Sequence, residues 1–245
     1  MYKRQVYQLF PDRFYDALDG ARIKRKRRAG PDIVVHRDKR EMPFVTPNGD
    51  GPDGIENNDF YGGNITGIRS KLAQLCALGV TAIYLNPIFE AASNHRYDTA
   101  NYERVDRMLG SNEDFIALCR EARRKGVRII LDGVFSHTGA DSVYFNKFGH
   151  YDSVGAYQSE SSPYASWYRF ERFPDKYETW WGIQSLPDVY KRQDVHRPRL
   201  VGIEPEINRL RPFAPLDQKL DLRVGSALLH QLPIPQRAVG PAAGA

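Results

Sequence analysis

An acid and a histidine follow one apolar stretch of the sequence, and they are the first candidates for chemistry. The segment RIILDGVFSHTG covers residues 128–139, with Asp132 at the end of the apolar run and His137 five positions later. A carboxylate and an imidazole can transfer protons, bind a metal or hydrogen-bond a sugar. The same spacing is equally consistent with two side chains that only satisfy neighbouring loops. The surrounding elements must decide between these interpretations.

Strand and helix patterns alternate on either side of these residues. They predict strands at 5–10, 80–85 and 127–132, and helices at 66–79 and 112–126. The first two strands are expected to be buried, and Thr66 is the predicted cap of the first helix. The order predicts a parallel sheet with right-handed crossovers, which gathers Asn86, Asp132 and His137 at its carboxyl edge.

Residues 140–188 lose this alternation and are rich in aromatic side chains. The nine that stand out are Tyr144, Phe145, Tyr151, Tyr157, Tyr164, Trp167, Tyr168, Trp180 and Trp181. Flat Tyr and Trp rings suit the apolar faces of sugar rings, while Asp, Asn and His satisfy sugar hydroxyls. We expect most of these rings to form a core and one or two to face a cleft, in a small irregular domain inserted into a βα loop.

Composition and charge restrict the class of protein. The 245 residues are 41% hydrophobic, with no apolar run long enough to span a membrane and no secretory signal, so a soluble cytoplasmic protein without a membrane partner is predicted. The net charge of +5 comes from residues 21–40 and 189–245, because the remainder holds 17 basic and 23 acidic residues. The basic run at 23–28 is interpreted as a solvated loop, and no nucleic-acid partner is predicted.

Five motifs in order carry a family resemblance. They are VYQLFPDRF (6–14), DFYGGNITGI (59–68), LGVTAIYLNPIFEAASNHRYDTANY (78–102), GVRIILDGVFSHTG (126–139) and WWGIQSLPDV (180–189). Together they resemble glycoside hydrolase family 13, the α-amylase family, and are most similar to its neopullulanase, cyclomaltodextrinase and maltogenic amylase group. The resemblance covers residues 6–189.

The resemblance implies an α/β fold, the N-terminal part of a (β/α)8 TIM barrel with strands one to three. Residues 1–138 would form that part, 139–188 the small inserted domain of the third βα loop, and 189–245 an unrelated or disordered tail. The implied substrate-binding residues are Tyr97, Asp98, Asp132 and His137. Tyr97 would stack under the sugar at the cleavage point, His137 would hydrogen-bond that sugar, and Asp132 would support the catalytic centre.

Two departures from the family concern metal binding. Ser136 stands where many relatives have Asn, on which some of them build a calcium site. Asn64 stands where relatives often have Asp after paired glycines. The first change replaces the Asn side chain that those relatives use, and the second replaces a carboxylate by an amide, so no metal or cofactor is predicted, although calcium is the ion that the resemblance raises.

The two catalytic carboxyl groups of a retaining glycosidase, about 5–5.5 Å apart, are not found in the sequence. The family places its nucleophile in a Gly-x-Arg-x-Asp strand, its acid Glu at strand five and a third Asp after an Asn-His pair, and none of these patterns occurs here. The sequence therefore predicts no catalytic residue of its own. It predicts a fragment of an α-glucan hydrolase that is inactive as it stands.

The tetrapeptide YKRQ occurs at 2–5 and again at 190–193, on either side of the family-like segment. We interpret both copies as scars of cloning, library construction or sequence assembly, with residues 194–245 unrelated or out of frame. A natural disordered tail is the alternative. Half of a barrel leaves strand edges unpaired, so aggregation is expected, while the oligomeric state is left open.

Two functional hypotheses remain at the level of sequence. The first is a hydrolase fragment whose parent acts on maltodextrins, cyclodextrins or pullulan by a retaining mechanism. The second is a non-catalytic sugar-binding protein that uses Tyr97, His137 and the Trp180–Trp181 pair. An α-glucan oligosaccharide is the expected partner in both, and the choice between α-1,4 and α-1,6 linkages stays open.

Overall fold

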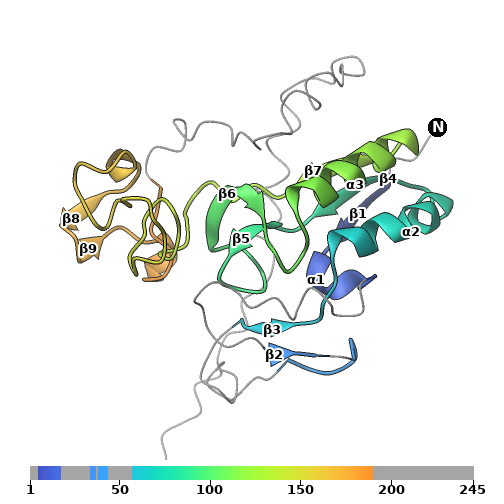
Figure 1. Ribbon diagram of the computed structural model, residues 1–245, viewed down its shortest axis with the longest axis horizontal. Coiled ribbons are helices and arrows are strands. Elements are labelled where there is room, and N and C mark those ends of the chain that lie inside the picture. Colours follow the sequence, from blue (N-terminus) through green and yellow to red (C-terminus); the bar gives the residue numbers. More distant parts are fainter. Residues whose placement is uncertain (1–4, 18–33, 37, 44–56, 190–245) are drawn as a thin grey trace, which may run out of the picture. The chain divides into compact units, whose positions relative to one another are not determined.

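A parallel three-stranded sheet is the central element of the computed structural model, which describes residues 5–17, 34–36, 38–43 and 57–189 (Figure 1). Its strands are β1 (Gln5–Leu9), β4 (Val80–Leu85) and β7 (Arg128–Leu131), in the order β1-β4-β7. The register sets Leu9 opposite Leu85, and Leu85 opposite Leu131. The predicted sheet is confirmed, and its three carboxyl ends are level.

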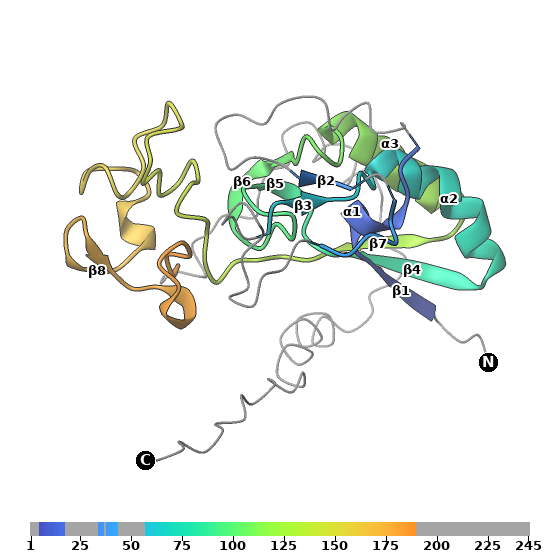
Figure 2. The same ribbon diagram turned by 90° about the horizontal axis from the view of Figure 1, so that it is seen from below.

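Two helices cover one face of this sheet, as Figures 1 and 2 both show. They are α2 (Ile65–Ala77) and α3 (Asn112–Arg124), which pack against each other and against β4 and β7 respectively. Their apolar stripes enclose the main core, whose fully buried side chains include Ile65, Ile68, Leu72, Ile83, Leu85, Leu109 and Leu118. Burial of this apolar surface is the main stabilisation of the βα units.

The helix ends follow capping chemistry, with one difference from the sequence prediction. The side chain of Asn64, not Thr66, caps α2 by accepting a hydrogen bond of 2.8 Å from the Gly67 N–H. Thr66 lies one residue inside the helix, where its hydroxyl cannot reach the first-turn donors in the same way. In α3, Ser111 and Asp114 form a reciprocal capping box.

The expectation that the first strand is buried is wrong. Four of the five residues of β1 are exposed, and Val6 is 60% accessible. Within the described residues β1 pairs only with β4, so its other edge has no neighbouring strand. Apolar composition identified the strand correctly, but burial depends on what covers it.

An antiparallel hairpin lies between β4 and α3 and was not predicted. Its strands are β5 (Phe89–Ala91) and β6 (Thr99–Val105), and the loop 92–98 joins them. The remaining short elements before α2 are α1 (Pro11–Phe14), β2 (Val34–Val35) and β3 (Asp59–Phe60). The hairpin carries Tyr97 and Asp98 at its tip.

The aromatic segment after Gly139 builds a second core with little regular structure. Its elements are η1 (Ala165–Trp167), β8 (Phe170–Arg172), β9 (Lys176–Tyr177) and η2 (Trp180–Gly182). The buried members of this core are Phe89, Tyr102, Ala140, Tyr144, Phe145, Ala156, Tyr168, Tyr177 and Val189. Three of the nine predicted aromatics are among these buried residues, and Tyr157, Tyr164 and Trp167 pack against them partly buried. The domain boundaries at 139 and 189 stay a prediction.

Several predictions about the ends of the chain lie outside the described residues. They concern the basic run at 23–28, the first copy of YKRQ apart from Gln5, and the tail from 190 onward. Within the described part of the chain, no helix combines the length and apolarity needed to cross a bilayer.

Candidate functional site

The carboxyl ends of the three parallel strands hold a line of polar side chains. Backbone hydrogen bonds continue the sheet by one residue, from the Asn86 N–H to Leu9 O and from the Asp132 N–H to Leu85 O, each 3.0 Å. The Gln8 side chain on β1 donates to Asn86 Oδ1 at 3.1 Å. The sheet thus fixes Asn86 and Asp132 at one edge, as the sequence predicted.

Tyr97 reaches this edge from the hairpin loop. Its hydroxyl donates to Asp132 Oδ2 at 2.9 Å and accepts from Asn86 Nδ2 at 3.3 Å. The Tyr84 hydroxyl, near the end of β4, lies close enough to Asp132 to lower the pKa of that carboxyl. One carboxylate therefore accepts from the Tyr97 phenol and lies near that of Tyr84, and both Tyr97 and Asp132 stay partly open to solvent.

His137 holds the other end of Tyr97. Its Nε2 lies 3.0 Å from the carbonyl oxygen of Tyr97, and its Nδ1 lies 3.0 Å from the hydroxyl oxygen of Ser136. Because a carbonyl can only accept, Nε2 carries the proton, and Nδ1 accepts from Ser136 in the neutral ring. The imidazole is only 2% exposed and lies against the Trp180 ring, with centroids 4.5 Å apart.

Asp98 organises the loop that presents Tyr97. Its carboxylate accepts from the backbone N–H groups of Ala92 and Ser93, at 3.1 and 3.0 Å, and from the Ser93 hydroxyl. These bonds join the two ends of the loop next to the strand ends Ala91 and Thr99. The structure brings Tyr97, Asp132 and His137 together directly, and Asp98 joins them through the loop backbone.

Burial dominates the electrostatics of the site. Desolvation raises the pKa of Asp132, although hydrogen bonds from Tyr97 and Tyr84 oppose the shift. Burial, with the charge of Asp132 nearby, raises the pKa of Tyr84 to about 12. Burial also lowers the pKa of His137, so the ring stays neutral at neutral pH. The site therefore presents a neutral imidazole and phenols that keep their protons.

The described residues do not fit a calcium site. Asn64 Nδ2 donates to Asp16 Oδ1 at 2.7 Å, so an N–H faces this carboxylate where a cation would need another oxygen. Within the described ranges, no three His, Cys, Asp or Glu side chains are grouped as metal ligands.

Sequence reasoning missed Tyr84 and Gln8. Tyr84 stands between Ile83 and Leu85, which both lie in the main core, and strand alternation turns it to the opposite side of the sheet. That alternation was the available signal, but the continuous apolar run of β4 hid it. Gln8 had no signal beyond its polarity in a strand.

This arrangement defines a class of protein. Parallel strands with helical crossovers, whose polar side chains gather at the carboxyl ends, are typical of the enzymes built on TIM barrels. A family model described as the catalytic domain of alpha amylase matches residues 8–195. The chain therefore belongs to the alpha-amylase catalytic-domain family, and its sheet is the N-terminal part of such a barrel.

Similar proteins agree with this assignment. The chain is 49% identical over 158 residues to an amylopullulanase of Thermoanaerobacterium saccharolyticum, a match over 62% of this chain and 12% of that protein. It superposes with a TM-score of 0.59 and 34% identity on the cyclic α-maltosyl-(1→6)-maltose hydrolase of Arthrobacter globiformis in complex with maltose, over 76% of this chain and 37% of that chain. The type III pullulan hydrolase of Thermococcus kodakarensis matches with a TM-score of 0.62 and 29% identity, over 83% and 35%.

The matches also show what share of each relative's length this chain covers. It spans about an eighth of the amylopullulanase and little more than a third of either structural relative.

Proposed function

We propose that this chain is the glucosyl-binding portion of an α-glucan hydrolase, and that it binds α-glucan oligosaccharides without cleaving them. The observation that carries the proposal is the double attachment of Tyr97, by its hydroxyl to Asp132 and by its carbonyl to His137. A tyrosine held at its hydroxyl and at its backbone carbonyl is a pre-organised platform, so little conformational entropy is lost when a sugar stacks on its ring. Maltodextrins, cyclodextrins and pullulan are the proposed substrates of the whole protein.

The polar groups around Tyr97 suit the hydroxyls of a sugar. Asp132 uses one oxygen for the Tyr97 hydroxyl, is partly exposed, and has lone pairs that can accept from a sugar hydroxyl. In the unliganded arrangement both nitrogens of His137 bond to the protein itself. We propose that His137 orients Tyr97 in the unliganded protein. When a sugar binds, the Nε2–H of His137 leaves the Tyr97 carbonyl oxygen and donates to the sugar instead.

The proposed lack of cleavage rests on the missing carboxyl pair. A retaining mechanism needs a nucleophile and an acid on either side of the glycosidic bond. The family patterns that carry these groups are absent from all 245 residues. In the described part of the chain, the groups that shift the pKa of Asp132 are the phenols of Tyr97 and Tyr84, with no second carboxyl among them.

Calorimetric titration of the chain with maltose and longer maltodextrins tests the binding. We expect saturable binding that Tyr97→Ala weakens strongly and that Tyr15→Ala, a change at a 40% exposed tyrosine outside the site, leaves unaltered. Binding that is unaffected by Tyr97→Ala would contradict the proposal.

A reducing-sugar assay with a cyclodextrin tests the lack of cleavage. We expect no product above background from the unaltered chain. Product release that His137→Ala abolishes would show that the chain is a complete catalyst, and would overturn this half of the proposal. A cytoplasmic location and the absence of a nucleic-acid partner stay predictions from the sequence.

A further inference from the structure

Arg96 is the largest fully buried side chain among the described residues, and it directly precedes Tyr97. It is 1% exposed and belongs to the loop 92–98. Its Nη1 donates to Asn94 O at 2.6 Å, whereas Nε and Nη2 are buried and make no hydrogen bond within the described part of the chain. Because buried charges are normally paired and hydrogen-bonded, a guanidinium with two unused donors calls for an explanation.

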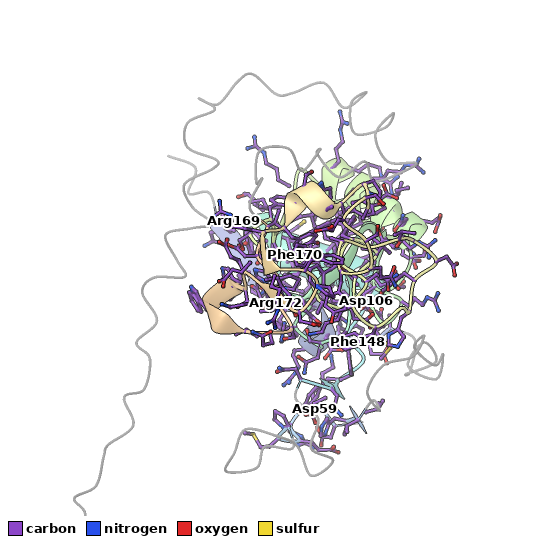
Figure 3. All side chains as sticks on the ribbon, turned by 90° about the vertical axis from the view of Figure 1, so that its left-hand side faces the viewer. Asp59, Asp106, Phe148, Arg169, Phe170 and Arg172 are labelled. Carbon is purple, nitrogen blue, oxygen red and sulfur yellow. The ribbon has the colours of Figure 1, made fainter. Side chains whose placement is uncertain are left out.

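Two buried carboxylates interact with the charge of Arg96. Its Nε lies 3.4 Å from Oδ2 of Asp106, which directly follows β6, and Figure 3 shows Asp106 among densely packed side chains. The second carboxylate is Asp12 in α1. Burial raises the pKa of Asp12, and the charge of Arg96 is the largest influence that opposes this rise. Arg96, Asp106 and Asp12 therefore form an ion cluster that links the hairpin to the segment after β1.

Backbone donors fix both carboxylates of the ion cluster. Asp12 accepts from the Tyr61 N–H at 3.0 Å, and Asp106 accepts from the Met108 N–H at 2.8 Å. Both carboxyl groups are at most 2% exposed. If Arg96 moved away, two buried carboxylates would lose their cation, which is strongly unfavourable. The ion cluster thus opposes movement of the loop that carries Arg96.

The backbone at Arg96 is held in an unfavourable conformation. Its φ of 63° lies in the left-handed region, which bulky side chains rarely adopt. The Arg96 N–H donates to Ser93 Oγ, and the Tyr97 N–H donates to His95 Nδ1, each at 3.0 Å. This turn lets adjacent side chains diverge, with Arg96 in the interior and Tyr97 bonded to Asp132. A strained backbone that its surroundings maintain is characteristic of ligand sites.

We infer that Arg96 is a positioning residue for sugar binding, because its buried charge fixes the loop that presents Tyr97. The inference rests on the proposed function and identifies the group that keeps the stacking platform in place. When the His137 Nε2–H leaves the Tyr97 carbonyl for a sugar, the loop loses one of its attachments. The ion cluster is buried and does not take part in that exchange, so it keeps Tyr97 beside Asp132 while the sugar binds.

Two measurements on the full chain follow the position of Tyr97. Histidine-selective NMR reports the Nε2–H of His137, whose bond to the Tyr97 carbonyl depends on where the loop lies. Calorimetry gives the dissociation constant for a maltodextrin. Arg96→Met keeps a long side chain but removes the charge, so we expect a displaced His137 signal. We also expect roughly three- to tenfold weaker binding, because the sugar must then order Tyr97.

Matched variants separate positioning from general effects of substitution. Arg96→Lys keeps a positive charge and should restore most of the affinity and of the NMR signal. Arg69→Met makes the same exchange at an arginine 3.9 Å from Glu121, outside the loop, and should change neither. Asp106→Asn removes one charge of the ion cluster and should displace the His137 signal less than Arg96→Met does. If Arg96→Met does not fold, Asp106→Asn decides the inference by the same two measurements.

Each outcome decides the inference. A displaced His137 signal and weaker binding in Arg96→Met, both restored in Arg96→Lys, support it. An unchanged signal or an unchanged affinity in Arg96→Met overturns it, whatever happens to stability, and leaves the proposed function intact. Equal losses in Arg96→Met and Arg96→Lys also overturn it, because the charge would then not fix the loop. No binding of any sugar by the unaltered chain overturns the proposed function, and the role of Arg96 in sugar binding with it.

Discussion

Tyr97 connects the two residues that the sequence had singled out for chemistry, Asp132 and His137. Replacing it by phenylalanine keeps the ring but removes the hydroxyl that bonds to Asp132 Oδ2 at 2.9 Å. The Tyr84 hydroxyl still lies near Asp132 in this variant, so the carboxylate is not left without a polar neighbour. We therefore expect the free energy of unfolding, measured with urea, to fall by about 1 kcal/mol. Tyr15→Phe is the control, and equal stabilities of the two variants would show that the Tyr97 hydroxyl contributes nothing.

The histidine supplies a prediction about pH. Burial holds the pKa of His137 below its ordinary value of 6.5. As the pH falls below that value, the unfolded chain takes up a proton that the folded chain resists, so this contribution to stability is present above 6.5 and is lost in acid. His137→Gln cannot titrate and lacks this loss.

The stability of the unaltered chain relative to His137→Gln should therefore be constant above neutrality and decrease from about pH 6.5 downward. Denaturant titrations at a series of pH values measure this difference. His36 and His95, whose pKa values shift in opposite directions, are present in both proteins, so their effects cancel. A difference that does not vary with pH would contradict the assigned burial effect.

Among the elements, the start of α2 offers a direct comparison of two side chains. Asn64 caps the helix and also donates to Asp16 and to Gly62 O, whereas Thr66, the residue expected from the sequence, lies inside the first turn. Asn64→Ala should cost at least about 1 kcal/mol in unfolding free energy. Thr66→Ala should stay within roughly 0.5 kcal/mol, as surface changes usually do. Thermal or urea unfolding measures both losses. A larger loss for Thr66→Ala than for Asn64→Ala would show that Thr66 is the cap.

The success of sequence reasoning differed among elements for physical reasons. Both helices were predicted because each buries an apolar stripe whose period can be read from the sequence, and the three sheet strands because each is a short apolar run between turn residues. The β5–β6 hairpin was missed because its short strands have no regular alternation and its loop 92–98 is fixed by side-chain bonds to Asp98. Side-chain bonds of this kind leave no periodic trace in the sequence.

The site was predicted to the extent that it depends on the sheet. Parallel strands bring Asn86 and Asp132 to one edge whatever the loops do, so their proximity followed from topology. The attachment of His137 to the carbonyl of Tyr97, 40 residues earlier, could not be foreseen from spacing. The same holds for Trp180 over the imidazole, since loop conformation alone brings those rings together.

At the scale of the whole molecule, the exposed strand β1 predicts self-association. Within the described residues one edge of β1 is unpaired, and Val6 and Tyr7 are 60% and 40% exposed. An unpaired apolar strand is a template for pairing with another chain. We expect light scattering to detect oligomers whose amount rises with protein concentration.

Val6→Lys should reduce this association, because a lysine on an edge strand opposes pairing. Met42→Lys adds the same charge at an 80% exposed loop position and serves as the control. Equal suppression by the two variants would assign the effect to net charge instead of the strand edge.

The two ends of the aromatic insertion run side by side. Three backbone hydrogen bonds of 2.8–3.2 Å join residues 136–140 to residues 185–189, immediately around His137. After the strand β7, the polypeptide therefore enters and leaves the insertion at nearly the same point. Because the cost of closing a loop grows only slowly with its length, the intervening segment can be lengthened, shortened or exchanged between relatives while the imidazole keeps its place. The length and sequence of the insertion can therefore vary without any change to the sheet that carries Asp132.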